Sequence, residues 1–319
     1  MVLGDCIRRN IASIDPLERA LLRDAFKELN NYKFPGDRND SPAAGGVTWW
    51  FKQDEIHQST HVHGGREFIP WHRDIINRME QMLRQINPQL SLHYWDWTQD
   101  PRAIPNANLG GGSTGTLNLF TENFMGYGGP TPQPIGEPWL SAGYYVPGAS
   151  PAREDTNNPA DPPAGRPNLR HCWRHVDDSI GPATTAQDNT ILSAGDFVSM
   201  NDRMIPVHDD MHGFVAMGPQ HRSFEDPFVF LLHSNVDRLF ARWQTDPVHP
   251  ERLNPDTVYG TASGSLDVLV EPWSTGFSLG RFTRPWCAPE NQGFQHTYKH
   301  LSIVSPPRYD TNHPLATTI

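Results

Sequence analysis

Two groups of histidines, far apart along the chain and each beside helix-like sequence, constrain the fold of this chain more than any other feature. They are His57, His61, His63 and His72 in the first half, and His208, His212 and His233 in the second. Imidazole is a common metal ligand, and a helical bundle can bring ligands from several facing helices into its core. The two groups therefore indicate a bundle with a dinuclear metal site between its halves.

Some of these histidines also have simpler interpretations. His208 and His212 are four residues apart, so a helix places them on one face, where they either chelate a metal or form an ordinary surface or core pair. His233 ends the apolar segment 226–233, where a buried imidazole needs a hydrogen-bond partner such as a backbone carbonyl. A polar loop accounts for two of the N-terminal histidines by chance. It accounts less readily for four beside the apolar segment 68–71.

Helical periodicity recurs in several stretches of the sequence. Helices are expected at about residues 15–30, 47–57, 71–86, 203–214 and 226–244. The first has the clearest start signal, because Asp15 suits the N-cap, Pro16 the first helical position and Glu18 the third.

The remaining sequence is poor in regular patterning. Residues 100–193 are rich in proline and contain Gly110-Gly111-Gly112, which indicates a long loop region, and short β-like runs such as 266–270 follow the last helix. The expected fold is mainly α. It is a four-helix bundle that holds the dinuclear site, wrapped by long Pro- and Gly-rich loops with a few short strands. We expect one domain over residues 1–319.

Composition excludes several classes of partner. The formal net charge of −10 and the pI near 5.8 leave no basic face for nucleic acid or for an anionic membrane surface. No apolar run approaches the ~20 residues of a membrane helix, and the N-terminus has no apolar leader. The compartment stays open between secretion, with the signal peptide already removed, and the cytoplasm, and so does the oligomeric state.

The cysteines do not explain the metal site. Cys6, Cys172 and Cys287 form no CxxC pair, which argues against a cysteine zinc site. They fit either one disulfide with a free thiol or three separate thiols.

Three motifs resemble those of one known family. The CuA signature of tyrosinases, catechol oxidases and their hemocyanin relatives is similar to the segment from His63 through Phe68 and His72-Arg73 to Glu80. The CuB signature of the same family resembles Asp226-Pro227 followed by His233 and Asp237-Arg238. The segment that follows the CuA helix in this family resembles Tyr94-Trp95-Asp96-Trp97. The chain thus resembles the type 3 dicopper proteins, with a CuA half at about 47–97, a CuB half at about 200–244 and a loop-rich insert at about 100–195.

The resemblance implies two copper ions as cofactors. The ligands it implies are His57, His63 and His72 for CuA and His208, His212 and His233 for CuB. His61 is the alternative third CuA ligand, because with His57 it forms the i,i+4 pair that hemocyanins use. Many fungal and plant members carry a thioether-forming cysteine where this chain has His61, so no thioether is expected.

The resemblance also implies an activity. The expected reaction is the oxidation of o-diphenols to o-quinones with O2 as co-substrate, together with ortho-hydroxylation of monophenols. Three neutral imidazoles suit copper and leave coordination positions open. A metal ion favours the phenolate over the phenol, whose pKa is ordinarily about 10. The expected partners are therefore small phenols and O2.

Four residues beside the ligands are further candidates. Asp209 stands where tyrosinases often have Asn, and it is expected either to accept a proton or to weaken monophenol hydroxylation through its charge. Gly213, after the second CuB ligand, implies an open pocket for bulky phenols. Arg73 and Asp237 are expected to pair across their helices behind the ligands; the alternative is two solvated charges.

Other functions stay open at this point. An o-aminophenol oxidase is one, and a hemocyanin-like oxygen-binding protein, favoured by the His57–His61 spacing, is another. A zinc hydrolase is a remote third, because His208-Asp209-x-x-His212 is similar to the His-Glu-x-x-His motif. Too few residues follow 244 for the C-terminal lid of latent tyrosinases, so we expect an open site or an earlier cleavage.

Overall fold

The computed structural model describes residues 3–31, 50, 53–54, 57, 63–139, 172–217, 220–264, 266, 298–299 and 301–312. Its helices are α1 (Pro16–Leu29), α3 (Phe68–Ile86), α4 (Thr185–Leu192), α5 (Phe197–Phe214), α6 (Phe228–Gln244) and α7 (Leu301–Val304). Its 3-10 helices are η1 (Gln220–Glu225), η2 (Pro250–Leu253) and η3 (Gly260–Ala262). Its strands are β1 (Ile104–Gly110), β2 (Ser113–Leu117), β3 (Gln133–Pro134), β4 (Trp173–Val176) and β5 (Val215–Ala216). The fold is mainly helical with a few short strands, which confirms the expected fold class.

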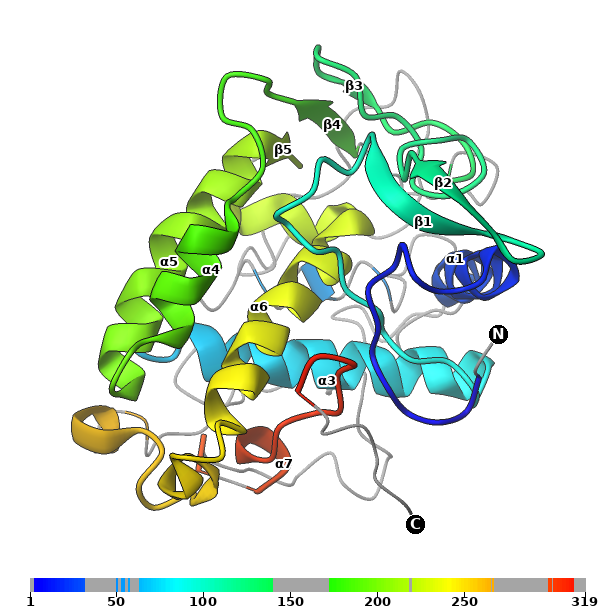
Figure 1. Cartoon of the computed structure of the whole chain (residues 1–319). Helices are drawn as coiled ribbons and strands as arrows, with labels where there is room; N and C mark the ends of the chain where they lie inside the picture. The colour runs from blue at the N-terminus through cyan, green and yellow to red at the C-terminus, as the bar shows by residue number, and fades with distance from the viewer. Residues whose placement is uncertain are drawn as a thin grey trace, which may run out of the picture.

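The centre of the fold is the crossing of α3 and α6 (Figure 1). Figure 1 shows α4 and α5 side by side along one flank and α1 at the other, near the β1–β2 hairpin. Almost every residue of α6 is buried, because the segment that opens with Phe228-Val229-Phe230-Leu231-Leu232 is apolar on all sides. This buried helix carries His233 into the middle of the molecule.

Local signals explain where α1 and α3 begin and end. The Asp15 side chain accepts a hydrogen bond from the Leu17 N–H at 2.9 Å, and Pro16 occupies the first position of α1, as the sequence predicts. The next long helix, α3, starts at Phe68, three residues earlier than expected, and ends at Ile86 as expected.

The structure corrects the expected start of α5. This helix begins at Phe197 rather than near 203, because the Asp196 side chain caps it by accepting from the Ser199 N–H at 2.7 Å. Pro206 lies inside α5 without ending it. Two additional turns therefore precede the ligand-bearing part of the helix.

The expectation of a patternless loop between 100 and 193 is wrong in the described parts of that region. Gly110-Gly111-Gly112, all with positive φ, form the turn between the antiparallel strands β1 and β2. β4 pairs with β3 on one side and β5 on the other. Thr184 and Gln187 form a capping box that starts α4.

Some expectations fall largely outside the described residues. Of the expected helix at 47–57 the structure describes Trp50, Gln53, Asp54 and His57, all with helical backbone. Only Leu266, in a turn, is described from the expected β-like run at 266–270.

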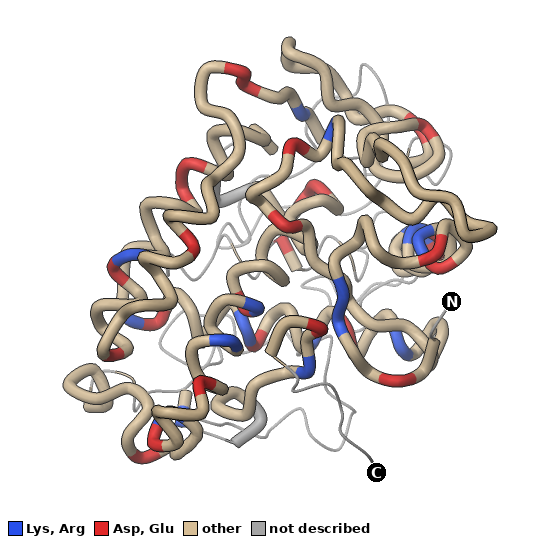
Figure 2. The backbone as a smooth tube through the Cα atoms, viewed as in Figure 1, with Lys and Arg blue, Asp and Glu red and all other residues tan. Residues whose placement is uncertain are grey.

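Charged residues of both signs occur throughout the described part of the chain (Figure 2). Figure 2 shows acidic and basic positions interspersed over helices and loops. Within the described residues no helix is both long and apolar enough to cross a membrane.

Candidate metal centre

The first histidine triad is built around the start of α3. It joins His57, which has helical backbone, His63 on the bend before α3, and His72 in the first turns of α3. One ring nitrogen from each lies within 4.8 Å of the others. The Nε2 atoms of His57 and His63 are 2.7 Å apart. Three imidazoles that converge this closely offer their lone pairs to a single point.

The second triad joins α5 to α6. His208 and His212 stand one turn apart on α5, with ring centroids 4.5 Å apart, and His233 faces them from α6. One nitrogen from each again lies within 4.8 Å of the others. The Nε2 atoms of His208 and His233 are 3.1 Å apart.

The two triads face each other. The rings of His72 and His233 stack with centroids 4.5 Å apart and planes 7° from parallel. His57 and His233 have centroids 6.4 Å apart, and those of His63 and His208 are 6.5 Å apart. Six imidazoles from both halves of the sequence thus enclose one common space.

Hydrogen bonds to Nδ1 fix the orientation of three of the rings. His72 Nδ1 lies 2.7 Å from the carbonyl oxygen of Phe68, and His233 Nδ1 lies 3.0 Å from that of Val229. Since a carbonyl only accepts, each Nδ1 carries the proton and each Nε2 keeps its lone pair. His208 differs, because its Nδ1 bonds to the carboxylate of Asp209 at 2.9 Å.

The donor set fits a metal ion. His72 Nε2 and both ring nitrogens of His212 are buried and have no hydrogen-bond partner within the described residues. A buried polar atom without a partner costs free energy unless something satisfies it. Three imidazoles in each group, without a carboxylate or thiolate, are a donor set that suits copper.

Four of the six triad histidines are held in the neutral form. Burial lowers the pKa of His72, His208 and His233 well below its ordinary value, and repulsion from neighbouring imidazoles lowers it further. Burial likewise lowers the pKa of His212 to about 3. Neutral imidazole is the form that binds a metal, so protons do not compete for these nitrogens near pH 7.

Aromatic rings line the space between the triads. The Phe224 ring lies 4.3 Å from that of His57 and 5.1 Å from that of His233. The Phe68 ring lies 4.7 Å from both His72 and His208. These apolar walls restrict ring rotation and keep the surroundings of the imidazoles dry. The motif analysis did not identify Phe224, although it stands just before Asp226-Pro227.

Behind the ligands the structure pairs Arg73 with Asp237. The Arg73 Nε–H donates to an Asp237 carboxylate oxygen, and both side chains are buried. Asp237 also accepts from Arg8 at 2.9 Å and from the Tyr309 hydroxyl at 2.9 Å. Arg8 extends the cluster to Glu80, again at 2.9 Å. Sequence reasoning identified the central pair and missed Arg8 and Tyr309, whose partners lie far away in the chain.

The structure describes the surroundings of some of the other residues that the sequence singled out, but not of all. Gly213 lies next to His212, and a Cβ built there would come within 2.7 Å of Ile180 Cδ1. His61, the alternative ligand, and Cys287 lie outside the described residues. Cys6 is an exposed free thiol and Cys172 a buried one.

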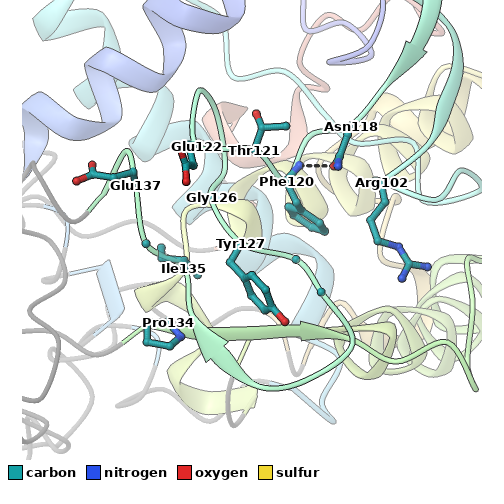
Figure 3. A pocket seen from close by; sticks show the side chains of 13 residues that line it. Arg102, Asn118, Phe120, Thr121, Glu122, Gly126, Tyr127, Pro134, Ile135 and Glu137 are labelled. Carbon is teal, nitrogen blue, oxygen red and sulfur yellow. Dashed lines mark hydrogen bonds between the residues drawn. The ribbon is translucent and has the colours of Figure 1, made fainter.

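A separate cavity of about 520 Å³ lies in the region of residues 102–137 (Figure 3). Phe120 and Tyr127 form part of its wall, Glu122 and Glu137 stand at one end and Arg102 at the other. None of the triad histidines lines it, so it is distinct from the metal centre.

Comparison with known proteins defines the class of this chain. Residues 43–246 match the family model described as the common central domain of tyrosinase. The chain therefore belongs to the tyrosinase family of type 3 copper proteins. Its two buried histidine triads are typical of a type 3 dicopper site.

Individual relatives carry different names. A tyrosinase of Streptomyces glaucescens is 24% identical over 282 residues, which are 84% of this chain and 88% of the relative. The hemocyanin 2-c chain of Megathura crenulata is 26% identical over 266 residues, which are 75% of this chain and 52% of that relative. A polyphenol oxidase variant from Thermothelomyces thermophila shares the fold with a TM-score of 0.62 at 18% identity, over 95% of this chain and 87% of that one.

Proposed function

We propose that this chain is a dicopper oxidase that uses O2 to oxidise o-diphenols to o-quinones. The observation that carries the proposal is the pair of facing triads, with His72 and His233 stacked at 4.5 Å and four of the six imidazoles neutral. The match to the tyrosinase domain and the tyrosinase relative support the same reaction class.

In this proposal each triad holds one copper ion. The CuA ligands are His57, His63 and His72, and the CuB ligands are His208, His212 and His233. When bound, the two ions supply electron exchange with O2 and the Lewis acidity that favours a phenolate over a phenol. Two ions are suited to a diphenol, because forming the quinone removes two electrons.

The protein's own contribution is orientation and exclusion of water. The carbonyls of Phe68 and Val229 keep His72 and His233 in the tautomer that points Nε2 inward. Asp209 does the same for His208 with a carboxylate, which increases the basicity of that ring. We assign Asp209 this positioning role.

Substrate approaches, in this proposal, from the side of His212. His63 is partly buried and His212 keeps 9% of its surface exposed, whereas His57, His72, His208 and His233 keep 0%. Gly213 follows His212, and among the described residues the exposed Ile180 side chain is what a Cβ at Gly213 would meet. A phenol ring that enters there meets the ligands of CuB first.

Reversible oxygen binding is the second candidate function. The hemocyanin relative and the burial of five of the six triad histidines favour it. The two candidates differ in what happens when a diphenol is present, because a carrier needs a site that phenols do not reach.

The test begins with copper loading and measurement of copper per chain. The loaded protein is then mixed with catechol, and O2 consumption and quinone absorbance are followed together. Continuous O2 consumption with matching quinone formation supports the oxidase, and repeating the assay with a monophenol and an o-aminophenol defines the subclass. Oxygen uptake that reverses under vacuum, with no quinone, identifies a carrier instead. Fewer than two coppers per chain contradicts both.

A further inference from the structure

His63 is positioned differently from the other histidines of the two triads. The others have helical backbone, whereas His63 lies on the bend 63–67 that precedes α3. The hydrogen bonds of a helix fix where its side chains project. A ligand on a bend instead takes its position from whatever contacts hold that bend in place.

Two consecutive residues of α5 make these contacts. Asn201 Nδ2 donates to the carbonyl oxygen of Gly65 at 3.2 Å. Asp202 forms an ion pair with Arg66, and the Arg66 guanidinium also donates to the carbonyl oxygen of Val198 at 3.4 Å. The bend that carries His63 is thus bonded to α5 through the neighbouring residues Asn201 and Asp202.

Asn201 is unusual for a residue that only packs. It is 1% exposed, and its Oδ1 atom is buried without a hydrogen-bond partner among the described residues. A half-satisfied buried amide costs free energy compared with an apolar side chain of similar size. The Nδ2 bond to Gly65 is therefore the favourable interaction that Asn201 makes and that an apolar side chain of similar size, such as leucine, cannot make.

The location of Asn201 on α5 connects the two triads. It precedes His208 by seven residues, about two helical turns, so both project from the same face, and His212 follows one turn later. One face of α5 therefore carries two ligands of the second triad together with the residue that holds the bend of the first.

We propose that Asn201 and Asp202 are positioning residues for His63, so that α5 sets the geometry of both metal sites. The inference rests on the proposed role of His63 as a copper ligand. If the contacts of Asn201 and Asp202 with the bend are lost, His63 should leave its position. His57 and His72, which are held by other elements, should remain. The CuA copper should then dissociate faster, and the CuB copper should not.

The experiment measures copper release from the loaded full-length chain to a Cu(I) chelator. The variants are Asp202→Asn, Asn201→Leu and the charge swap Arg66→Asp with Asp202→Arg. The matched control is Asp210→Asn, a second exposed carboxylate on α5. We expect one of the two coppers to leave about 10-fold faster in Asn201→Leu, the lower end of the usual cost of losing a group that orients a ligand. In Asp202→Asn the increase should be at most about 5-fold, because an exposed ion pair contributes little. The control should release copper like the parent chain, and the charge swap should restore slow release.

Each other outcome is decisive. Parent chain that holds fewer than two coppers overturns the proposed function and this inference with it. If the parent chain holds two coppers but Asp202→Asn and Asn201→Leu release both at the parent rate, only the proposed positioning role of Asn201 and Asp202 is overturned. Faster loss of both coppers together with a lower unfolding temperature indicates general destabilisation and also overturns it. If Asn201→Leu does not fold, the exposed Arg66 and Asp202 variants decide the question alone.

Discussion

The imidazole rings of His72 and His233 stack face to face, with centroids 4.5 Å apart and planes 7° from parallel. One ring belongs to each triad, and each is fixed from behind by a backbone carbonyl four residues earlier on its own helix. The crossing of α3 and α6 therefore sets the separation of the two metal sites directly. A displacement of α3 relative to α6 would therefore change both metal sites together.

Replacing either stacked ring should affect both sites. We expect His233→Gln or His72→Gln to bind at most one copper per chain, and the remaining ion to be held more weakly because its own stacked ligand has lost its neighbour. Copper per chain after dialysis, measured by atomic absorption, checks this. His249→Gln is the control, since His249 is an exposed histidine that belongs to neither triad and pairs with Glu251, and it should keep two coppers.

Acid should destabilise the metal-free protein earlier than an average fold. The pKa values of His72, His208, His212 and His233 lie below their unfolded value of 6.5, so the unfolded chain binds more protons in acid. The free energy of unfolding then falls as the pH drops below 6.5, by ~1.4 kcal/mol per pH unit for each such histidine. For His212 the loss continues down to its folded pKa of about 3.

Urea unfolding of the metal-free protein between about pH 7.5 and pH 5 measures this slope. His212→Gln should show a slope that is shallower by ~1.4 kcal/mol per pH unit, because one proton-binding site has been removed from the unfolded chain. Identical slopes for the two proteins would contradict the neutral, buried state of His212.

Two substitutions of Asp209 distinguish the contribution of its hydrogen bond to His208 from the contribution of its negative charge. Asp209→Asn retains an oxygen that can accept from His208 Nδ1, whereas Asp209→Ala retains neither the oxygen nor the charge. We expect copper affinity at the second triad to fall about tenfold in the alanine variant and less in the asparagine variant. Competition with a chelator measures it.

The same two variants test proton transfer from the phenol. If Asp209 accepts that proton, Asp209→Asn lowers the rate with monophenols much more than the rate with catechol. Equal changes with both substrates leave Asp209 with a positioning role alone. Asp210→Asn is the matched control, because it removes the next carboxylate on the same helix.

The buried charge cluster behind the ligands should dominate stability. Asp237→Asn leaves Arg73 and Arg8 without the carboxylate that both contact, and breaking a buried pair of this kind costs about 3–5 kcal/mol. Urea unfolding of the metal-free proteins gives the difference. Asp178→Asn, which breaks an exposed pair with Arg102, should change stability little. A similar effect from the two substitutions would refute the structural role of the cluster.

Access on the side of His212 should determine substrate size. Ile180 is 45% exposed, and its Cδ1 atom is the contact that a side chain at Gly213 would meet. We expect Ile180→Ala to raise kcat/KM for bulky diphenols relative to catechol, and Gly213→Val to lower it, with copper content unchanged in both. If the ratio of the two substrates stays constant across these variants, phenols enter from another side.

The helices that hold the site were largely predictable from local sequence. Asp15-Pro16 fixed the start of α1, and the apolar runs of α3 and α6 carried their own periodicity. The start of α5 was not predictable in the same way, because it depends on the capping bond from Asp196, seven residues before the expected start at 203. Boundaries of this kind depend on one side chain rather than on periodicity.

The candidate ligands could be recognised in the sequence, but the contacts that bring them and their neighbours together could not. The spacing of His208 and His212 placed the two rings on one helix face, as a chelating pair or an ordinary one, but no local pattern placed Phe224 between His57 and His233. Asn201 and Gly65 likewise belong to segments far apart in the chain, and their contact depends on how α5 packs near the start of α3. Such contacts follow from tertiary packing, to which a single sequence gives little access.

The contact between Arg8 and Tyr309 has a consequence for synthesis of the protein. Their side chains are 2.9 Å apart, and both bond to Asp237, one turn after His233. Until residue 309 has left the ribosome, the carboxylate behind the second triad lacks one of its partners, even though all of the triad histidines have already been made. Contacts between residues this far apart in the chain form late, since closing long loops costs entropy. We therefore expect a chain that lacks Tyr309 to hold Asp237, and with it the second triad, less firmly than a chain with all three partners.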